Sequence, residues 1–68
     1  NMQDAKIVLE YAIACKTDIA ATYSLLGTIY YNEQNQEGIK RLIESVKTIN
    51  SPNKESAANT LKQFIMSK

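Results

Sequence analysis

Residues Tyr23 to Tyr30 read Tyr-Ser-Leu-Leu-Gly-Thr-Ile-Tyr, and their spacing is the clearest indication of how this chain folds. In a helix, Tyr23, Leu26, Gly27 and Tyr30 share one face. The three large side chains can fill a core, while Gly27 lets the backbone of a neighbouring helix come close. A glycine inside a helix costs about 1 kcal/mol relative to alanine, so its presence indicates a packing role. We therefore expect a buried helix with close neighbours.

Apolar periodicity on either side of this stretch predicts four helices, over residues 3–15, 19–32, 36–50 and 52–66. The third helix has the cleanest pattern, with aliphatic residues at i, i+3, i+4, i+7 and i+10: Ile39, Leu42, Ile43, Val46 and Ile49. Residues 32–35 are polar and lack Gly and Pro, which predicts a short, tight connection. The expected fold is all-α, with four antiparallel helices.

Local signals complete this outline. Thr17 or Asp18 is placed to cap the second helix, and Ser51 followed by Pro52 favours a helix start there. Lys6 and Glu10 are spaced to pair across one turn of the first helix. The single cysteine, Cys15, cannot form an internal disulfide and is expected to be a small core residue.

The chain also resembles itself after a shift of 34 residues. Residues 5–10, Ala-Lys-Ile-Val-Leu-Glu, then align with residues 39–44, Ile-Lys-Arg-Leu-Ile-Glu. Tyr30 meets Phe64 under the same shift, whereas Gly27 meets Leu61, which is a poor match. The first and third helices are therefore predicted to be the same element in successive repeats, as are the second and fourth.

The pattern Tyr-x2-Leu-Gly-x2-Tyr, followed by Ile39, Ile43 and Pro52, resembles the tetratricopeptide repeat, a two-helix unit of about 34 residues. The family has a small residue where Ile39 stands and an aromatic where Ile43 stands. A generic antiparallel helical bundle is therefore the alternative fold.

The resemblance implies that residues 1–68 form one tetratricopeptide-like module. Residues 3–15 would be the second helix of a preceding repeat, residues 20–53 one complete repeat, and residues 52–66 a C-terminal capping helix. The polar far side of the last helix suits a cap.

The first predicted helix is apolar on most sides, which is typical of a helix with neighbours on more than one side. One interpretation is that a preceding helix has been cut away. The alternative is self-association as a homodimer through a face formed by Val8, Tyr11, Ala12 and Cys15. Surplus surface alanine and tyrosine on a marginal helix would also give this pattern.

The family resemblance implies a protein-interaction module that holds a peptide or a partner protein in a concave groove. Carried over to this chain, the groove-facing residues would be Ala21, Ser24, Thr28, Tyr31, Asn32, Glu55, Ala58, Lys62 and Ile65. Some family members hold the C-terminal carboxylate of a chaperone with Lys, Asn and Arg residues. Ser24 and Thr28 do not supply that chemistry, so we predict no such clamp.

Composition argues against other functions. The net charge is +1, from eight basic and seven acidic residues mixed along the chain, which gives no footprint for nucleic acid. There is no histidine, no metal-ligand cluster and no phosphate-binding glycine loop, so we expect no enzyme activity, no catalytic residues, no cofactor and no metal. No apolar run is long enough to span a membrane. We expect a cytoplasmic protein, and abundant Lys, Ile and Asn hint at an AT-rich bacterial genome.

Overall fold

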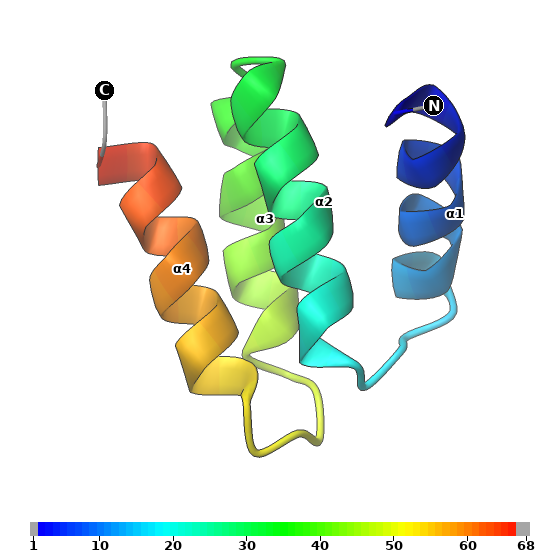
Figure 1. Ribbon diagram of the computed structural model, residues 1–68. Coiled ribbons are helices and arrows are strands. Elements are labelled where there is room, and N and C mark those ends of the chain that lie inside the picture. The colour runs from blue at the N-terminus through cyan, green and yellow to red at the C-terminus, as the bar shows by residue number, and fades with distance from the viewer. Residues whose placement is uncertain (1, 67–68) are drawn as a thin grey trace.

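The computed structural model describes residues 2–66, and these residues form four helices and no strand. The helices are α1 (Met2–Ala14), α2 (Ala20–Asn32), α3 (Gln36–Val46) and α4 (Lys54–Met66). Successive helices run in opposite directions, so α2 and α4 point the same way (Figure 1). The predicted all-α fold of four antiparallel helices is confirmed.

The helix at the centre of the molecule is α2. It packs against α1, α3 and α4, and α3 also packs against α4, whereas α1 packs against α2 alone among the described helices. The principal-axis extents are 28 × 27 × 15 Å. Because a helix with its side chains is about 10–12 Å across, the molecule is a slab one to two helices thick. Helix α1 forms one edge of this slab (Figure 1).

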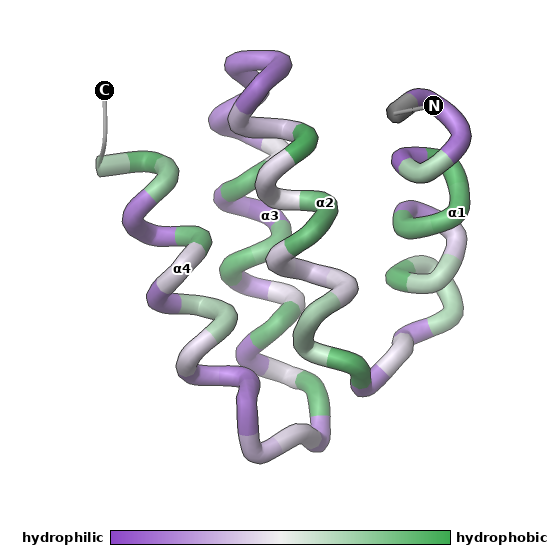
Figure 2. The backbone as a smooth tube through the Cα atoms, in the orientation of Figure 1, coloured by the Kyte–Doolittle hydropathy of each residue, from purple (hydrophilic) through white to green (hydrophobic). Residues whose placement is uncertain are grey.

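The core lies between α2, α3 and α4. Its most deeply buried large side chains are Leu26, Ile39, Val46 and Leu61. Tyr23 is also buried, and its hydroxyl donates a hydrogen bond to the Thr17 carbonyl oxygen at 3.1 Å, which satisfies its one polar group. Hydrophobic residues recur along α1 as well, although this helix lies at the edge of the slab (Figure 2).

Gly27 has the packing role that its position in the sequence predicts. A Cβ atom at Gly27 would overlap Cδ2 of Leu61 and contact the Phe64 ring. The close approach is therefore made by side chains of α4 rather than by its backbone. The other glycine, Gly38, lies under the Tyr30 ring, where a Cβ would be 2.6 Å from Cδ2.

Two predicted helix boundaries are wrong. Helix α3 ends at Val46 instead of Asn50, because the chain continues in tighter turns with Thr48 N bonded to Ser45 O and Ile49 N to Val46 O. Ile49 nevertheless remains buried. Helix α4 begins at Lys54, two residues after Pro52.

The predicted caps also differ from the structure. Ile19 occupies the N-cap of α2 without a side-chain hydrogen bond. Thr17 Oγ1 accepts from the Ile19 amide, and Asp18 Oδ1 accepts from the amide of Asn50 at 3.2 Å, so Asp18 joins two loops instead of capping a helix. Ser51 Oγ accepts from Asn53 N, which places Pro52 in a turn before α4.

Both helix hairpins that involve α2 follow a helix end of the Schellman type. After α1, Thr17 N bonds to Ala12 O and Lys16 has φ 61°. After α2, Asn35 N bonds to Tyr30 O and Gln34 has φ 59°. These left-handed residues close the turns without glycine, and Asn35 then caps α3 by accepting from Gly38 N at 3.0 Å. The connection between α2 and α3 is therefore short and tight, as predicted.

Candidate interaction surface

The nine predicted groove-facing residues do not line a single groove. Ala21 and Ser24 line a shallow hollow between α2 and α4. Thr28 lies on the opposite flank of α2, beside α1. Tyr31 and Asn32 line a third hollow near the α2–α3 turn. There the Tyr31 ring stacks on Phe64 with 5.1 Å between ring centroids.

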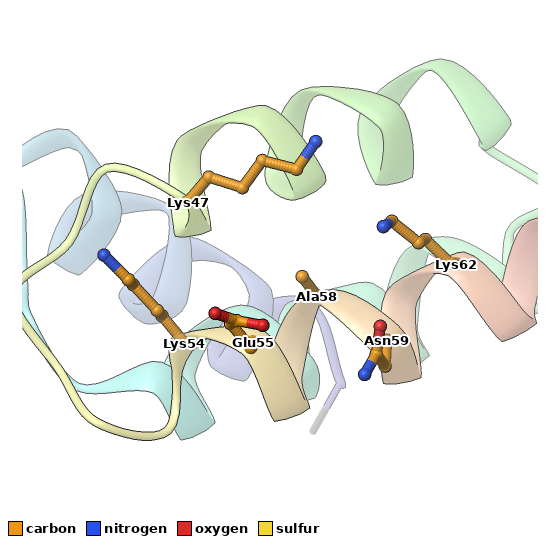
Figure 3. A pocket seen from close by; sticks show the side chains of 6 residues that line it. All are labelled: Lys47, Lys54, Glu55, Ala58, Asn59 and Lys62. Carbon is orange, nitrogen blue, oxygen red and sulfur yellow. The ribbon is translucent and has the colours of Figure 1, made fainter.

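Three of the four residues predicted on α4 lie on its α3 side instead of lining the hollow beside α2. Glu55, Ala58 and Lys62 line a groove of about 310 Å³ between these two helices (Figure 3). Ala58 is buried at the base of that groove, and Ile65 packs half-buried against the core. Eight of the nine residues that the resemblance implied are thus divided among four hollows.

The cause is a one-residue rotation of α4. The buried and partly buried positions of α4 correspond to those of α2 when the two helices are aligned with a shift of 35 residues instead of 34. The corresponding pairs are Thr22 with Ala57, Tyr23 with Ala58, Leu26 with Leu61, and Tyr30 with Ile65. One residue turns a helix by roughly 100°, which moves the predicted face of α4 away from α2. The hollow beside Ala21 and Ser24 is lined instead by Ser56, Ala57 and Thr60 of α4 and by Asn53 just before it, none of which was predicted from the sequence. The spacing of the apolar residues between positions 57 and 65 indicates which side of α4 is buried, and could have predicted this rotation.

An almost entirely apolar groove lies between α1 and α2. Ala5, Val8 and Leu9 line it from α1, and Leu25 and Ile29 line it from α2. Asp4 and Thr28 are its polar neighbours, and its volume is about 490 Å³. Val8 is 67% exposed and Leu25 57% exposed, so both walls are available to a partner. We name this feature the α1–α2 groove. Leu25 is not among the residues predicted from the sequence to bind a partner.

Polar contacts on the other flank of α1 hold the two helices in register. Lys6 Nζ lies 3.0 and 3.1 Å from the carboxylate oxygens of Glu33, and 5.8 Å from the centre of the Tyr30 ring. The Tyr30 hydroxyl donates a hydrogen bond to Glu10 Oε2 at 2.6 Å. The predicted pair of Lys6 with Glu10 is therefore wrong, because each side chain reaches across to a residue beyond α1.

Burial and the nearby Glu10 carboxylate, which accepts the hydrogen bond, raise the pKa of Tyr30 to about 12. Burial and the charge of Asp18 raise the pKa of Tyr23 as well. Both hydroxyls therefore stay protonated at neutral pH and act as hydrogen-bond donors. Their role is to position α1 and the loop before α2.

The predicted self-association face lies on α1. Val8 and Tyr11 are exposed, and Ala12 is partly buried. Cys15 is exposed, so its predicted place in the core is wrong. It directly follows the last residue of α1, and its amide still donates to the Tyr11 carbonyl oxygen at 3.0 Å, so Cys15 continues the exposed side of that helix.

The groove in Figure 3 carries three lysines. Lys47 and Lys62 extend over the space above Ala58, while Lys54 points away from it. Lys47 Nζ is also 3.7 Å from a carboxylate oxygen of Glu44, and Glu55 lies in the groove wall. The acidic neighbours offset the lysine charge, so the groove does not concentrate it.

Residues 2–66 contain no cluster of three or more His, Cys, Asp or Glu side chains that could hold a metal ion. None of the described helices is long and apolar enough to cross a membrane. No protein-family profile, no curated protein and no solved structure matches this chain. The structure itself therefore defines the class: a small all-α protein with an open apolar groove between two of its helices.

Proposed function

We propose that this chain is a protein-interaction module of the tetratricopeptide-like kind, and that it docks an amphipathic helix or peptide in the α1–α2 groove. The observation that carries the proposal is the exposure of Val8 and Leu25 on the two walls of a groove with apolar residues Leu9 and Ile29 behind them. Exposed apolar surface of this kind marks interaction sites. The function involves no catalytic step, cofactor or metal.

The fold contains an internal precedent for such docking. Under the 34-residue shift, Ala5, Val8 and Leu9 of α1 correspond to Ile39, Leu42 and Ile43 of α3. Those three α3 residues are buried in the core, where α3 packs against α2 and α4. Because the matching positions in α1 are only partly covered, a helix placed in the α1–α2 groove would give α1 the environment that α3 already has.

In this proposal residues 20–53 form one repeat, α1 is the second helix of a preceding repeat, and α4 is the cap. The exposed residues Glu55, Asn59 and Gln63 give α4 the polar side that a cap requires. The partner is a protein or peptide instead of nucleic acid, and a bacterial cytoplasm is the proposed setting.

A binding selection followed by NMR tests the proposal. Helical peptides displayed on phage are selected against the wild-type chain, and the selected peptides are titrated into labelled protein. We expect amide shifts concentrated at Ala5, Val8, Leu9, Leu25 and Ile29. The variant Leu25→Glu should weaken binding by about tenfold or more, because a charge then lines an apolar site.

Met66→Glu is the matched control, since Met66 is 81% exposed and lies at the end of α4, away from the groove. It should bind as the wild type does. Peptides that bind Leu25→Glu equally well, or that shift amides of α4 instead, would refute the proposal.

Self-association is the second candidate function, and Tyr11 favours it. This large side chain is 72% exposed on the face of α1 that also carries Val8 and Cys15, with Ala12 at its margin. The proposed product is a homodimer. Sedimentation equilibrium separates the candidates, because a chain that stays monomeric at high concentration does not pair through this face, which leaves peptide docking in the α1–α2 groove as the remaining candidate.

A further inference from the structure

We propose that two copies of this chain pair through α1 in antiparallel orientation, with Asp4 of each copy beside Lys16 of the other. The contact surface is the outer face of α1, formed by Asp4, Ile7, Val8, Tyr11 and Cys15. The inference rests on the self-association candidate and adds its geometry. The surface shares Asp4 and Val8 with the α1–α2 groove, so a second copy and a docked peptide would compete for them.

The outer face is continuous and lies opposite the side of α1 that packs on the core. Its residues are spaced by three and four positions, which places them along one stripe of a helix. Leu9 and Ile13, on the opposite side, pack against the core cluster. Ile7, Val8 and Tyr11 are each more than half exposed. The centre of the outer face is thus an apolar strip that no described helix covers.

Opposite charges lie near the two ends of α1. Asp4 lies in the first turn, and Lys16 is the second residue after the last turn. Both are exposed, and neither forms an ion pair within residues 2–66. A surface that is apolar in the middle and bears opposite charges at its ends is complementary to itself when one copy is reversed.

Charge selects the direction of pairing. In a parallel pair, Asp4 would meet Asp4 of the second copy, and Lys16 would meet Lys16. In an antiparallel pair centred between Val8 and Tyr11, Val8 lies opposite Tyr11 of the second copy, and Asp4 lies beside Cys15 and Lys16. The antiparallel arrangement therefore replaces two like-charge contacts with two attractive ones.

The size of the surface predicts a weak dimer. One three-turn helix face on each copy buries roughly 1,000 Å² in total, the lower limit for a specific interface. A dissociation constant in the micromolar range or weaker is the expected result. The same chain carries the apolar side chains and both of the opposite charges that the pairing needs, and this favours a second copy over an unrelated partner.

A charge swap measured by sedimentation equilibrium tests the pairing. Asp4→Lys and Lys16→Asp should each weaken the dimer by about fivefold, and the double variant should recover most of that loss. Circular dichroism checks that each variant keeps its helices, because Asp4 also favours the first turn of α1. Tyr11→Glu should abolish the dimer, and Met66→Glu should leave it unchanged. A wild type that remains monomeric at millimolar concentration, or a double variant weaker than both single ones, overturns the inference.

Disulfide trapping tests the direction separately from the existence of a dimer. In the variant Asp4→Cys, the introduced thiol lies opposite Cys15 of the second copy, so oxidation should give a covalent dimer quickly. The wild type and Asp4→Cys/Cys15→Ser should cross-link slowly, because like positions lie far apart. Within one chain, positions 4 and 15 are about 16 Å apart along the helix, too far for a disulfide. Fast cross-linking of the wild type would overturn the antiparallel geometry while leaving self-association in place.

Discussion

Helices α1 and α3 have matching sequence patterns but opposite environments. Leu42 in α3 is 4% exposed, whereas Val8, its counterpart under the 34-residue shift, is 67% exposed. The difference comes from the number of neighbours: α3 packs against both α2 and α4, and α1 packs against α2 alone. An apolar pattern thus predicts which face of a helix can be buried, and the neighbouring helices decide whether it is.

The largest expected effect comes from truncating a side chain between the packed helices. Leu61→Ala should destabilise the fold by about 2–5 kcal/mol, because Leu61 is completely buried and fills the space left by Gly27. Val8→Ala, a truncation on the exposed side of α1, should cost under about 0.5 kcal/mol. Urea unfolding followed by circular dichroism measures both. If both variants lost the same free energy of unfolding, α1 would be packed as tightly as the other helices, contrary to the structure.

The contact between α2 and α4 gives the next largest effect. Gly27→Ala should destabilise by about 1–3 kcal/mol, even though alanine is the better helix former, because the new methyl group would displace Leu61. The double variant Gly27→Ala/Leu61→Val removes atoms at the point of overlap and should cost less than the two single changes added together. A stabilising Gly27→Ala would show that the helices separate freely.

Removing the Tyr30 hydroxyl tests how α1 is held. Tyr30→Phe should cost about 1 kcal/mol, because it deletes the hydrogen bond to Glu10 across the α1–α2 contact. The pKa of Tyr30 is raised from 10.0 to about 12, so the folded state binds this proton more tightly than the unfolded state does. The stabilisation is therefore complete below pH 10 and is lost as pH rises towards 12. The difference in stability between the wild type and Tyr30→Phe should shrink over that window, and a constant difference would count against this role.

The smallest effect is expected at the two left-handed residues. Gln34→Gly should stabilise the chain by about 0.5–1 kcal/mol, because glycine adopts a φ of 59° without a steric cost. Lys16→Gly should relieve the same strain, but only at the end of α1. Global unfolding should therefore respond more to the first change than to the second. Identical shifts in the urea midpoint would indicate that α1 unfolds together with the other helices.

Much of the fold could be predicted from the sequence, because periodicity encodes which side of each helix is apolar. Tyr23, Leu26, Ile39 and Val46 are buried as their spacing implies. The helix ends were less predictable. Ile49 stays buried after α3 has ended, so its apolar character fits the periodic pattern without showing where the helix stops.

The candidate site was harder to predict, since it depends on how helices are rotated about their axes. Helices α2 and α4 correspond at a shift of 35 residues instead of 34, and this rotation places Glu55 and Lys62 on the side of α4 that faces α3. No motif in the sequence has Leu25 as a defining position, and this residue lines a groove only because α1 lies beside it in the folded chain. Cys15 lies in a run that is apolar on most sides, so the sequence pattern did not show which side is buried, and Cys15 is exposed.

Native-state hydrogen exchange, with and without a peptide selected for binding, tests whether α1 is the open side of an interaction groove. Amides of Leu9 and Ile13 in α1 should exchange faster than those of Leu26 and Leu42, because one neighbouring helix protects less than two or three. Bound peptide should slow exchange in α1 and change α3 little. If α1 and α3 exchange at the same rate in the free protein, or if the peptide protects α4 instead, α1 is not the open side of an interaction groove.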